Sequence, residues 1–175
     1  MKGLFSLLIW SISASYALVP MPRACNPKLD DSTPMRADSE IVSYWDEFQA
    51  DALKAGLPQF DTSGFEMGFR MTQDDTDFLS RYPRTVAFCQ ESTKRIIVKR
   101  EYWQRLDYWG KRLVLRHEFG HCFLNLEHTH ALDAPHTDLN IMDAGLMDAT
   151  EYARNASQYD TDLFRSNRTT ASVSK

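Results

Sequence analysis

This sequence of 175 residues has few glycines, no long apolar run and only a small excess of negative over positive charge. The formal net charge of −4 gives no basis for a role in binding nucleic acid or the surface of a membrane. Only seven glycines stand against four Trp, seven Tyr and ten Phe, a balance that favours a packed core over disorder. The sequence contains no internal repeat, and its length suits a single domain.

An apolar run near the N-terminus is too short to span a bilayer and is typical of a secretory signal peptide. Lys2 provides the positive charge and Leu4–Ile12 the apolar segment. Ser15 and Ala17 place small residues at the −3 and −1 positions, so we expect a signal peptide over residues 1–17 with cleavage after Ala17. The mature protein is therefore expected to be secreted or periplasmic, without stable insertion in a membrane.

Cysteine is also scarce, and the three cysteines are Cys25, Cys89 and Cys122. In an oxidising compartment this odd number allows at most one disulfide and leaves one thiol. A Cys89–Cys122 bridge, which would pin a strand to the histidine-bearing helix described below, is favoured over Cys25–Cys89, with buried free thiols as the alternative. Pro22 and Arg23 stand where a lipid-attachment sequence needs small or apolar residues, which disfavours a lipid anchor at Cys25.

All five histidines fall within residues 117–136, and three of them follow the spacing of a zinc site. His117, Glu118 and His121 form an HExxH sequence, which on a helix places both imidazoles on one face, one turn apart. A catalytic zinc takes three protein ligands and leaves one position open for water, and His128 can supply the third. The sequence thus predicts zinc held by His117, His121 and His128, with Glu118 as the catalytic residue that reaches the bound water.

The third ligand has alternatives. Glu127, His130 and His136 lie close to His128 in the sequence and could take its place. A glutamate on a later helix, such as Glu151, is a further candidate. A further alternative is that there is no functional site, and that the helix carries two incidental histidines and binds no metal.

Hydrophobic periodicity predicts an α+β domain. The elements expected from it are a helix from Asp38 or Ser39 to Gly56, a half-buried strand at Phe65–Met71, a polar loop at Thr72–Arg84, strands at 85–90 and 95–99, a central helix ending at Asn125, and a short final helix at 149–165. We expect a small twisted sheet of three to four strands, packed on the first helix and the central helix. The expected organisation is a signal peptide (1–17), an extended leader (18–37), a catalytic domain (38–165) and a flexible tail (166–175).

The central helix is expected to have two faces with different roles. Leu113, His117, His121 and Leu124 share one of them, and Leu115, Phe119, Cys122 and Leu126 share the other. One face therefore carries the metal ligands while the other packs on the sheet. The helix has to end before His128, and Asn125 is the expected exit because asparagine tolerates the left-handed conformation.

These residues resemble the metzincin clan of zinc peptidases, whose pattern HExxHxxGxxH is followed by a methionine turn under the metal. His117, Glu118 and His121 match that pattern. Leu124 stands at its Gly position, and His128 comes one residue later than its third histidine.

A group of small secreted bacterial HExxH proteins resembles the chain more closely, over about residues 38–165. The group shares the longer spacing to the third histidine, a Cys directly after the second one, and a Leu-Asn or Leu-Gly exit from the helix, here Leu124-Asn125. Its Ile-Met pair corresponds to Ile141-Met142, which would form the methionine turn. The resemblance implies a zincin-like single domain that binds zinc.

The function implied by the resemblance is that of a secreted zinc metallopeptidase, acting as a monomer on peptides or proteins. Glu118 would act as general base toward zinc-activated water and then deliver the proton to the leaving amine. Tyr152 is a candidate oxyanion donor or switch ligand, weighed against an ordinary core or surface tyrosine. Cys25 in the leader is a candidate for blocking the zinc in a latent form.

Two other functions compete with proteolysis. A non-catalytic zinc-binding interaction domain could keep the same scaffold, although a purely structural site has no use for Glu118. A zinc hydrolase acting on non-peptide amides, such as a deformylase, would take a Cys ligand from an upstream strand, where Cys89 is placed. Secretion and the third histidine count against that second alternative.

Overall fold

The computed structural model describes residues 34–129, 140–145 and 147–171. The expected signal peptide (1–17), residues 18–33 of the expected leader, and the alternative ligands His130 and His136 lie outside the described residues. Within the described part of the chain, no helix is both long and apolar enough to cross a membrane.

A mixed sheet of four strands organises the domain, with the spatial order β1-β2-β4-β3. β1 (Arg36–Ala37), β2 (Glu66–Gly68) and β4 (Arg95–Val98) are parallel, and β3 (Ala87–Gln90) pairs antiparallel with β4 at one edge. A short 3₁₀ turn and Lys94, whose φ of 52° lies in the left-handed region, join β3 to β4. The two strands expected at 85–90 and 95–99 are confirmed, and they pair as an antiparallel hairpin.

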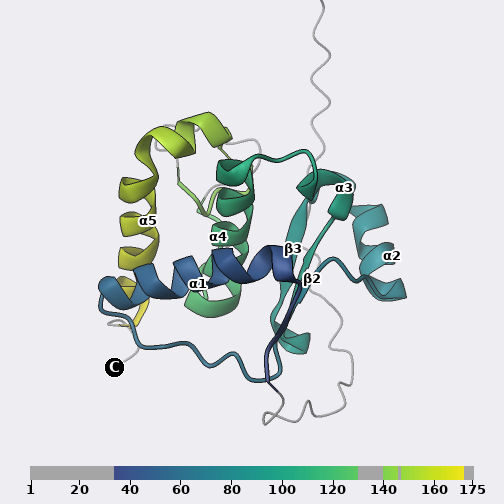
Figure 1. Cartoon of the computed structure of the whole chain (residues 1–175), viewed down its shortest axis with the longest axis horizontal. Helices are drawn as coiled ribbons and strands as arrows, with labels where there is room; N and C mark the ends of the chain where they lie inside the picture. Colours follow the sequence, from purple (N-terminus) through teal and green to yellow (C-terminus); the bar gives the residue numbers. More distant parts are fainter. Residues whose placement is uncertain (1–33, 130–139, 146, 172–175) are drawn as a thin grey trace, which may run out of the picture.

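Helices cover both faces of the sheet (Figure 1). α1 (Ser39–Lys54) and α4 (Tyr108–Leu124) pack on one face, α2 (Gln73–Arg81) packs on the other, the single turn α3 (Arg100–Trp103) follows β4, and α5 (Ala149–Ala171) packs against α4. The strands supply both faces by alternation, because Ile96 and Val98 join the α1–α4 core while Ile97 joins the α2 side. This arrangement confirms the expected α+β domain.

The first helix and the central helix meet through aromatic side chains. The buried stripe of α1 is the one that helical spacing predicts and consists of Ile41, Trp45, Phe48 and Ala52. Ring centroids of Trp45 and Phe48 lie 5.3 and 4.9 Å from that of Phe119 on α4. Such edge-on and tilted aromatic pairs add to the free energy gained from burying the rings, so α1 fixes one side of α4.

The prediction of a polar loop at Thr72–Arg84 is wrong, because most of that segment forms α2. Thr72 caps the helix: its hydroxyl accepts from the N–H of Asp75, and the Asp75 carboxylate accepts in return from the Thr72 N–H at 2.7 Å. Asp75 is only 2 % exposed and pairs with Arg95 of β4 at 2.8 Å, so it is not the solvated aspartate that composition suggests. Leu79 then packs the helix on the sheet.

The final helix is longer than expected. α5 continues to Ala171 instead of ending at residue 165, and it contains one non-helical residue, Asn155, with φ −127° and ψ 21°. Leu163 and Phe164 from its second half are buried in the main core. The helix is therefore part of the folded domain at least as far as Phe164. It packs on α4 on the side that α1 leaves open.

Thr72→Ala is expected to lower the free energy of unfolding by about 1 kcal/mol, because it removes the side-chain cap of α2. The corresponding fall in melting temperature is about 2–4 °C. Thermal unfolding followed by circular dichroism measures it. Thr76→Ala, an exposed threonine of the same helix, is the matched control and is expected to leave the melting temperature unchanged or slightly raised. Equal melting temperatures for the two variants would contradict the capping role.

Candidate metal centre

The ends of α4 are fixed by local interactions that the sequence supplies. At its start the carboxylate of Asp107 accepts a hydrogen bond from the N–H of Gly110 at 2.8 Å. At its end Asn125 adopts φ 52° and ψ 40°, and the N–H of Leu126 turns back to the carbonyl of Gly120 at 3.1 Å. The expected left-handed exit at Asn125 is confirmed, and it redirects the chain toward the histidine face of the helix.

The exit explains why the third histidine comes one residue late. In the pattern HExxHxxGxxH the glycine stands three residues before the last histidine. Here Leu124, at the glycine position, is still helical, and Asn125 makes the turn three residues before His128. The helix end and the third histidine are thus displaced together by one residue, so the spacing between them is kept.

The structure brings the three predicted histidines together. The Nε2 atom of His117 lies 3.1 Å from those of His121 and His128, and the latter two are 3.2 Å apart. Among the described residues they are the group of potential ligands whose atoms converge on one point. His117 is 6 % exposed and His128 is exposed, so the centre opens from the core toward the surface.

Backbone carbonyls fix which nitrogen of His117 and which nitrogen of His121 can bind a metal. The Nδ1 atom of His117 lies 2.7 Å from the carbonyl oxygen of Ile141, and that of His121 lies 2.6 Å from the carbonyl oxygen of Leu126. Since a carbonyl can only accept, both Nδ1 atoms carry hydrogen and both Nε2 atoms present lone pairs. Two lone pairs at 3.1 Å are not a hydrogen bond, and they repel each other unless a cation lies between them.

The donor set fits zinc. Imidazole nitrogens bound to one tetrahedral zinc at the usual bond length lie about 3.3 Å apart, close to the separations observed here. Burial lowers the pKa of His117 to about 3 and also lowers the pKa of His121 and of His128. All three imidazoles are therefore held neutral, which is the form that binds a metal.

Glu118 points to the other flank of α4, toward β3. It is 5 % exposed, and this burial raises the pKa of its carboxyl to about 8. The nearby backbone N–H of Cys89 acts on this pKa in the opposite direction, favouring the carboxylate. The side chain thus stays next to the first ligand without belonging to the group of converging nitrogens.

The segment 140–143 forms the floor of the centre. Its Ile141 carbonyl orients His117, as described above, and its Met142 carbonyl accepts from the N–H of Thr129, next to the third histidine, at 3.0 Å. Met142 is buried, and its sulfur lies where a side chain on Gly120 of α4 would stand. This is the place expected for the methionine turn.

Asp143 ties the floor to the segment that carries the third histidine. Its carboxylate accepts from the hydroxyl of Thr129 and from the N–H of Asn140, at 3.2 Å for the latter. The sequence did not predict a role for this carboxylate or for the backbone carbonyls of Ile141 and Met142. No residue-type signal marks a backbone carbonyl, whereas Asp143 directly after Ile141-Met142 could have been found.

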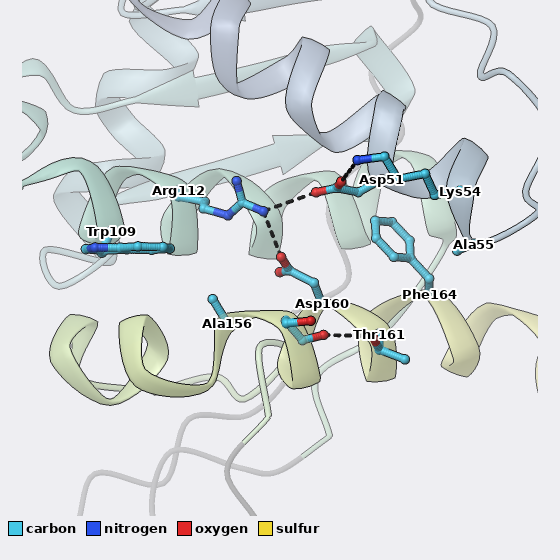
Figure 2. A pocket seen from close by; sticks show the side chains of 10 residues that line it. Asp51, Lys54, Ala55, Trp109, Arg112, Ala156, Asp160, Thr161 and Phe164 are labelled. Carbon is cyan, nitrogen blue, oxygen red and sulfur yellow. Dashed lines mark hydrogen bonds and ion pairs between the residues drawn. The ribbon is translucent and has the colours of Figure 1, made fainter.

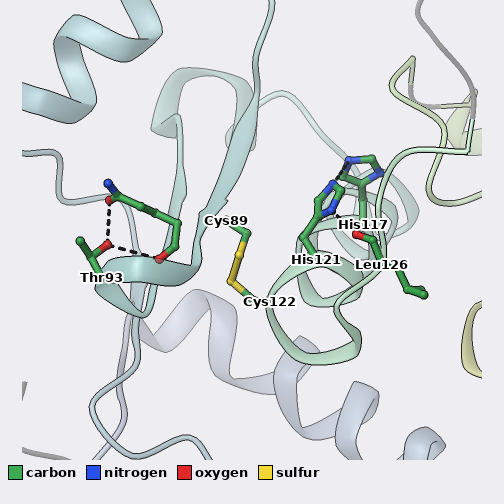
Figure 3. The surroundings of a disulfide bond; sticks show 7 residues. Cys89, Thr93, His117, His121, Cys122 and Leu126 are labelled. Atoms are coloured by element: carbon green, nitrogen blue, oxygen red, sulfur yellow. Dashed lines mark hydrogen bonds between the residues drawn. A yellow bond between two sulfur atoms is a disulfide. The ribbon is translucent and has the colours of Figure 1, made fainter. Parts of the chain in front are cut away.

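A disulfide joins Cys89 of β3 to Cys122 of α4 (Figure 3). The pairing that was favoured on the sequence is therefore confirmed, and Cys25–Cys89 is excluded by it. The disulfide also removes Cys89 as a metal ligand, because a metal binds a thiolate and not a disulfide sulfur. The histidines leave α4 on a different side from Cys122 (Figure 3).

Other candidates from the sequence are engaged elsewhere. Glu151 accepts hydrogen bonds from Asn155 and Tyr159 on its own helix. Tyr152 is fully buried and donates to Asp160 at 2.8 Å, and burial raises the pKa of its hydroxyl. Neither side chain is part of the converging group, and Glu127 is exposed outside it.

A cavity of about 670 Å³ lies away from this centre, between α1, α4 and α5 (Figure 2). Arg112 stands in its wall and pairs with Asp51 at 3.1 Å and with Asp160 at 2.8 Å. The wall contains neither Glu118 nor any of the three converging histidines. The charged side chains of this wall therefore pair with one another.

Comparison of the chain with known protein families finds a match to one family model. The family model described as pregnancy-associated plasma protein-A, Peptidase_M43, matches residues 72–174, which is more than half of the chain. The match includes α2, the β3–β4 hairpin, α4 and the segments that carry the third histidine and Met142. No curated protein and no solved structure matches the chain.

His128→Ala is expected to abolish zinc binding, because it leaves two ligands where a catalytic zinc needs three. Metal analysis after dialysis against trace zinc measures it, with about one zinc per chain expected for the unaltered protein. His130→Ala serves as the control and is expected to retain the metal. A full complement of zinc in His128→Ala would show that another residue is the third ligand.

Proposed function

Because the chain belongs to the Peptidase_M43 family of zinc-dependent metalloendopeptidases, a metzincin family, we propose that it hydrolyses peptide bonds at the centre formed by His117, His121 and His128. The observation that carries the proposal is the convergence of the three Nε2 atoms with Glu118 on the next flank of the helix. A purely structural zinc site takes four protein ligands, whereas the described part of the chain supplies three here.

A zinc ion at this position would act as a Lewis acid toward the scissile carbonyl and, by its charge, would keep Glu118 ionised. The imidazoles of His117 and His121 hold their Nε2 lone pairs inward because the carbonyls of Ile141 and Leu126 keep the protons on the opposite nitrogens. These two tautomers are set before any ligand arrives, which favours the binding of a cation.

Glu118 is the general base of the proposed reaction. Its carboxylate accepts the proton of the attacking water and then donates it to the nitrogen of the leaving amine. Burial limits the water around the carboxylate, and the backbone N–H of Cys89 favours its ionised form. The charge of a bound zinc would offset the effect of burial on the pKa of Glu118, so that the base is ionised when the water attacks.

The outer edge of β3 supports a peptide or protein substrate. The N–H of Lys99 donates to the carbonyl of Val86, and bonded pairs alternate along an antiparallel ladder, so Ala87 and Cys89 turn their backbone groups away from β4. Among the described residues no strand pairs with that edge. An extended peptide could add there by main-chain hydrogen bonds, next to the metal-binding helix.

The two competing functions are less well supported. A non-catalytic zinc domain does not account for the buried carboxylate of Glu118, which burial disfavours unless it has a use. A zinc hydrolase with a cysteine ligand would need Cys89 as a thiolate, and that residue is in the disulfide.

We also propose that the protein is exported, with the signal peptide removed after Ala17. A disulfide between β3 and α4 supports this, because such bonds persist in oxidising compartments. The expected products are a mature chain beginning at Leu18, recovered from the periplasm or the medium of expressing cells and identified by N-terminal sequencing. A chain that keeps Met1 and stays in the cytosol would contradict export.

Glu118→Gln is expected to keep zinc but lower kcat by at least about a hundredfold, because the amide cannot accept the proton. Cleavage of a peptide library measures activity, and metal analysis measures zinc in the same samples. Glu127→Gln, which alters an exposed carboxylate beside the third ligand, is the matched control and is expected to retain activity. Peptide cleavage that survives in Glu118→Gln would remove the base from the proposed mechanism, and release of formate from formyl-peptides would favour the hydrolase.

A further inference from the structure

The third histidine of the centre is held differently from the other two. The Nδ1 atoms of His117 and His121 lie 2.7 and 2.6 Å from backbone carbonyl oxygens, which orient both rings. For the Nδ1 atom of His128 the described part of the chain provides no such partner, and the residue is exposed. The place of His128 in the centre therefore depends on how its backbone is held.

Contacts on both sides of His128 hold that backbone. Before it, the N–H of Leu126 donates to a carbonyl in the last turn of α4 at 3.1 Å. After it, the N–H of Thr129 donates to the carbonyl of Met142 at 3.0 Å, and the hydroxyl of Thr129 donates to the carboxylate of Asp143. Because Thr129 is itself exposed, apolar packing contributes little to holding this end of the segment.

Asp143 also closes the turn that presents these groups. Its N–H donates to the carbonyl of Asn140 at 3.2 Å, and its carboxylate accepts from the N–H of Asn140 at the same distance. The side-chain oxygen of Asn140 accepts from the N–H of Met142 at 2.9 Å. With its own groups paired in this way, the turn directs the carbonyls of its two middle residues toward His117 and Thr129.

The chemistry of this position calls for a carboxylate. Asp143 is 1 % exposed, and burying a charged group is costly unless hydrogen bonds compensate it. One of its oxygens accepts from Thr129 and the other accepts from Asn140. An asparagine of the same shape could supply only one of these acceptors, because its second terminal atom is a donor. The carboxylate thus joins the turn and the segment of the third histidine at once.

We propose that Asp143 is a positioning residue for the third metal ligand: acting through the hydroxyl of Thr129, it sets the place of His128 and so the affinity of the centre for zinc. Asp143 does not itself belong to the converging group. This role rests on the metal centre of the proposed function, and it does not depend on which bond the centre cleaves.

The hydroxyl of Thr129 is tested with two variants of the full chain, Thr129→Val and Thr129→Ser. Valine keeps the shape of threonine without the hydroxyl, whereas serine keeps the hydroxyl. Zinc affinity is measured by competition with a chromophoric chelator, at a temperature where circular dichroism shows each chain folded. Thr129→Val is expected to weaken zinc binding about ten- to a hundredfold and Thr129→Ser less than about threefold. Equal zinc affinities for the two variants would overturn the proposal.

A double variant tests whether Asp143 acts through Thr129. Asp143→Ala is expected to weaken zinc binding at least as much as Thr129→Val does. Adding Thr129→Val to Asp143→Ala is then expected to weaken it less than about threefold further, because the hydrogen bond is already lost. Losses that multiply would show that the two residues act independently. If Asp143→Ala does not fold, the two single variants at Thr129 still decide the question.

Two further outcomes separate this role from others. A role in stability alone would lower the melting temperature of Thr129→Val and leave the zinc affinity of the folded chain unchanged, which would contradict the proposal. An unaltered chain that binds zinc but cleaves no peptide would remove the proposed function and leave the role of Asp143 in place. In the zinc-free protein, amide hydrogen exchange at residue 129, corrected for its intrinsic rate, is expected to be at least about tenfold faster in Thr129→Val than in Thr129→Ser. Equal corrected rates would contradict the hold on the backbone.

Discussion

The site depends on one constraint, which is that α4 cannot rotate about its axis. Each side of the helix packs against a different neighbour. His117 faces the metal centre, and Glu118 faces β3. Phe119 packs on the aromatic residues of α1, and Gly120 lies against Met142. These four consecutive residues thus meet four different neighbours, because each step along a helix turns the side chain by about 100°. A rotation of α4 would break all of these contacts together.

Charged side chains hold the first half of α4 where apolar packing alone would not. Arg116 is 1 % exposed, pairs with Asp51 at 2.5 Å, and lies between the rings of Phe48 and Phe164. Two of its nitrogens, Nε and Nη1, have no hydrogen-bond partner among the described residues, and the adjacent ring faces offset this in part. Because breaking one member out of a buried ion pair costs about 3–5 kcal/mol, the network fixes how α1, α4 and α5 meet.

The centre was largely predictable because its signal is local. Spacing alone identified the three histidines, and the tolerance of asparagine for the left-handed region located the exit at Asn125. The α2 helix was missed because its cap and its buried Asp75 are polar, and a reading by composition treats polar residues as loop. The buried guanidinium of Arg116 was missed for the same reason. The carbonyl of Ile141 could not be predicted, since only the fold brings it to His117.

Gly120 makes the motif more demanding than its three fixed letters imply. A glycine inside a helix lowers its stability by about 1 kcal/mol relative to alanine, and here the missing side chain gives Met142 its room. Phe119, beside it, must be large enough to fill the space against α1. The two positions between Glu118 and His121 are therefore not interchangeable spacers. A sequence search for this fold that requires a bulky residue followed by glycine there would discard most accidental occurrences of the bare pattern.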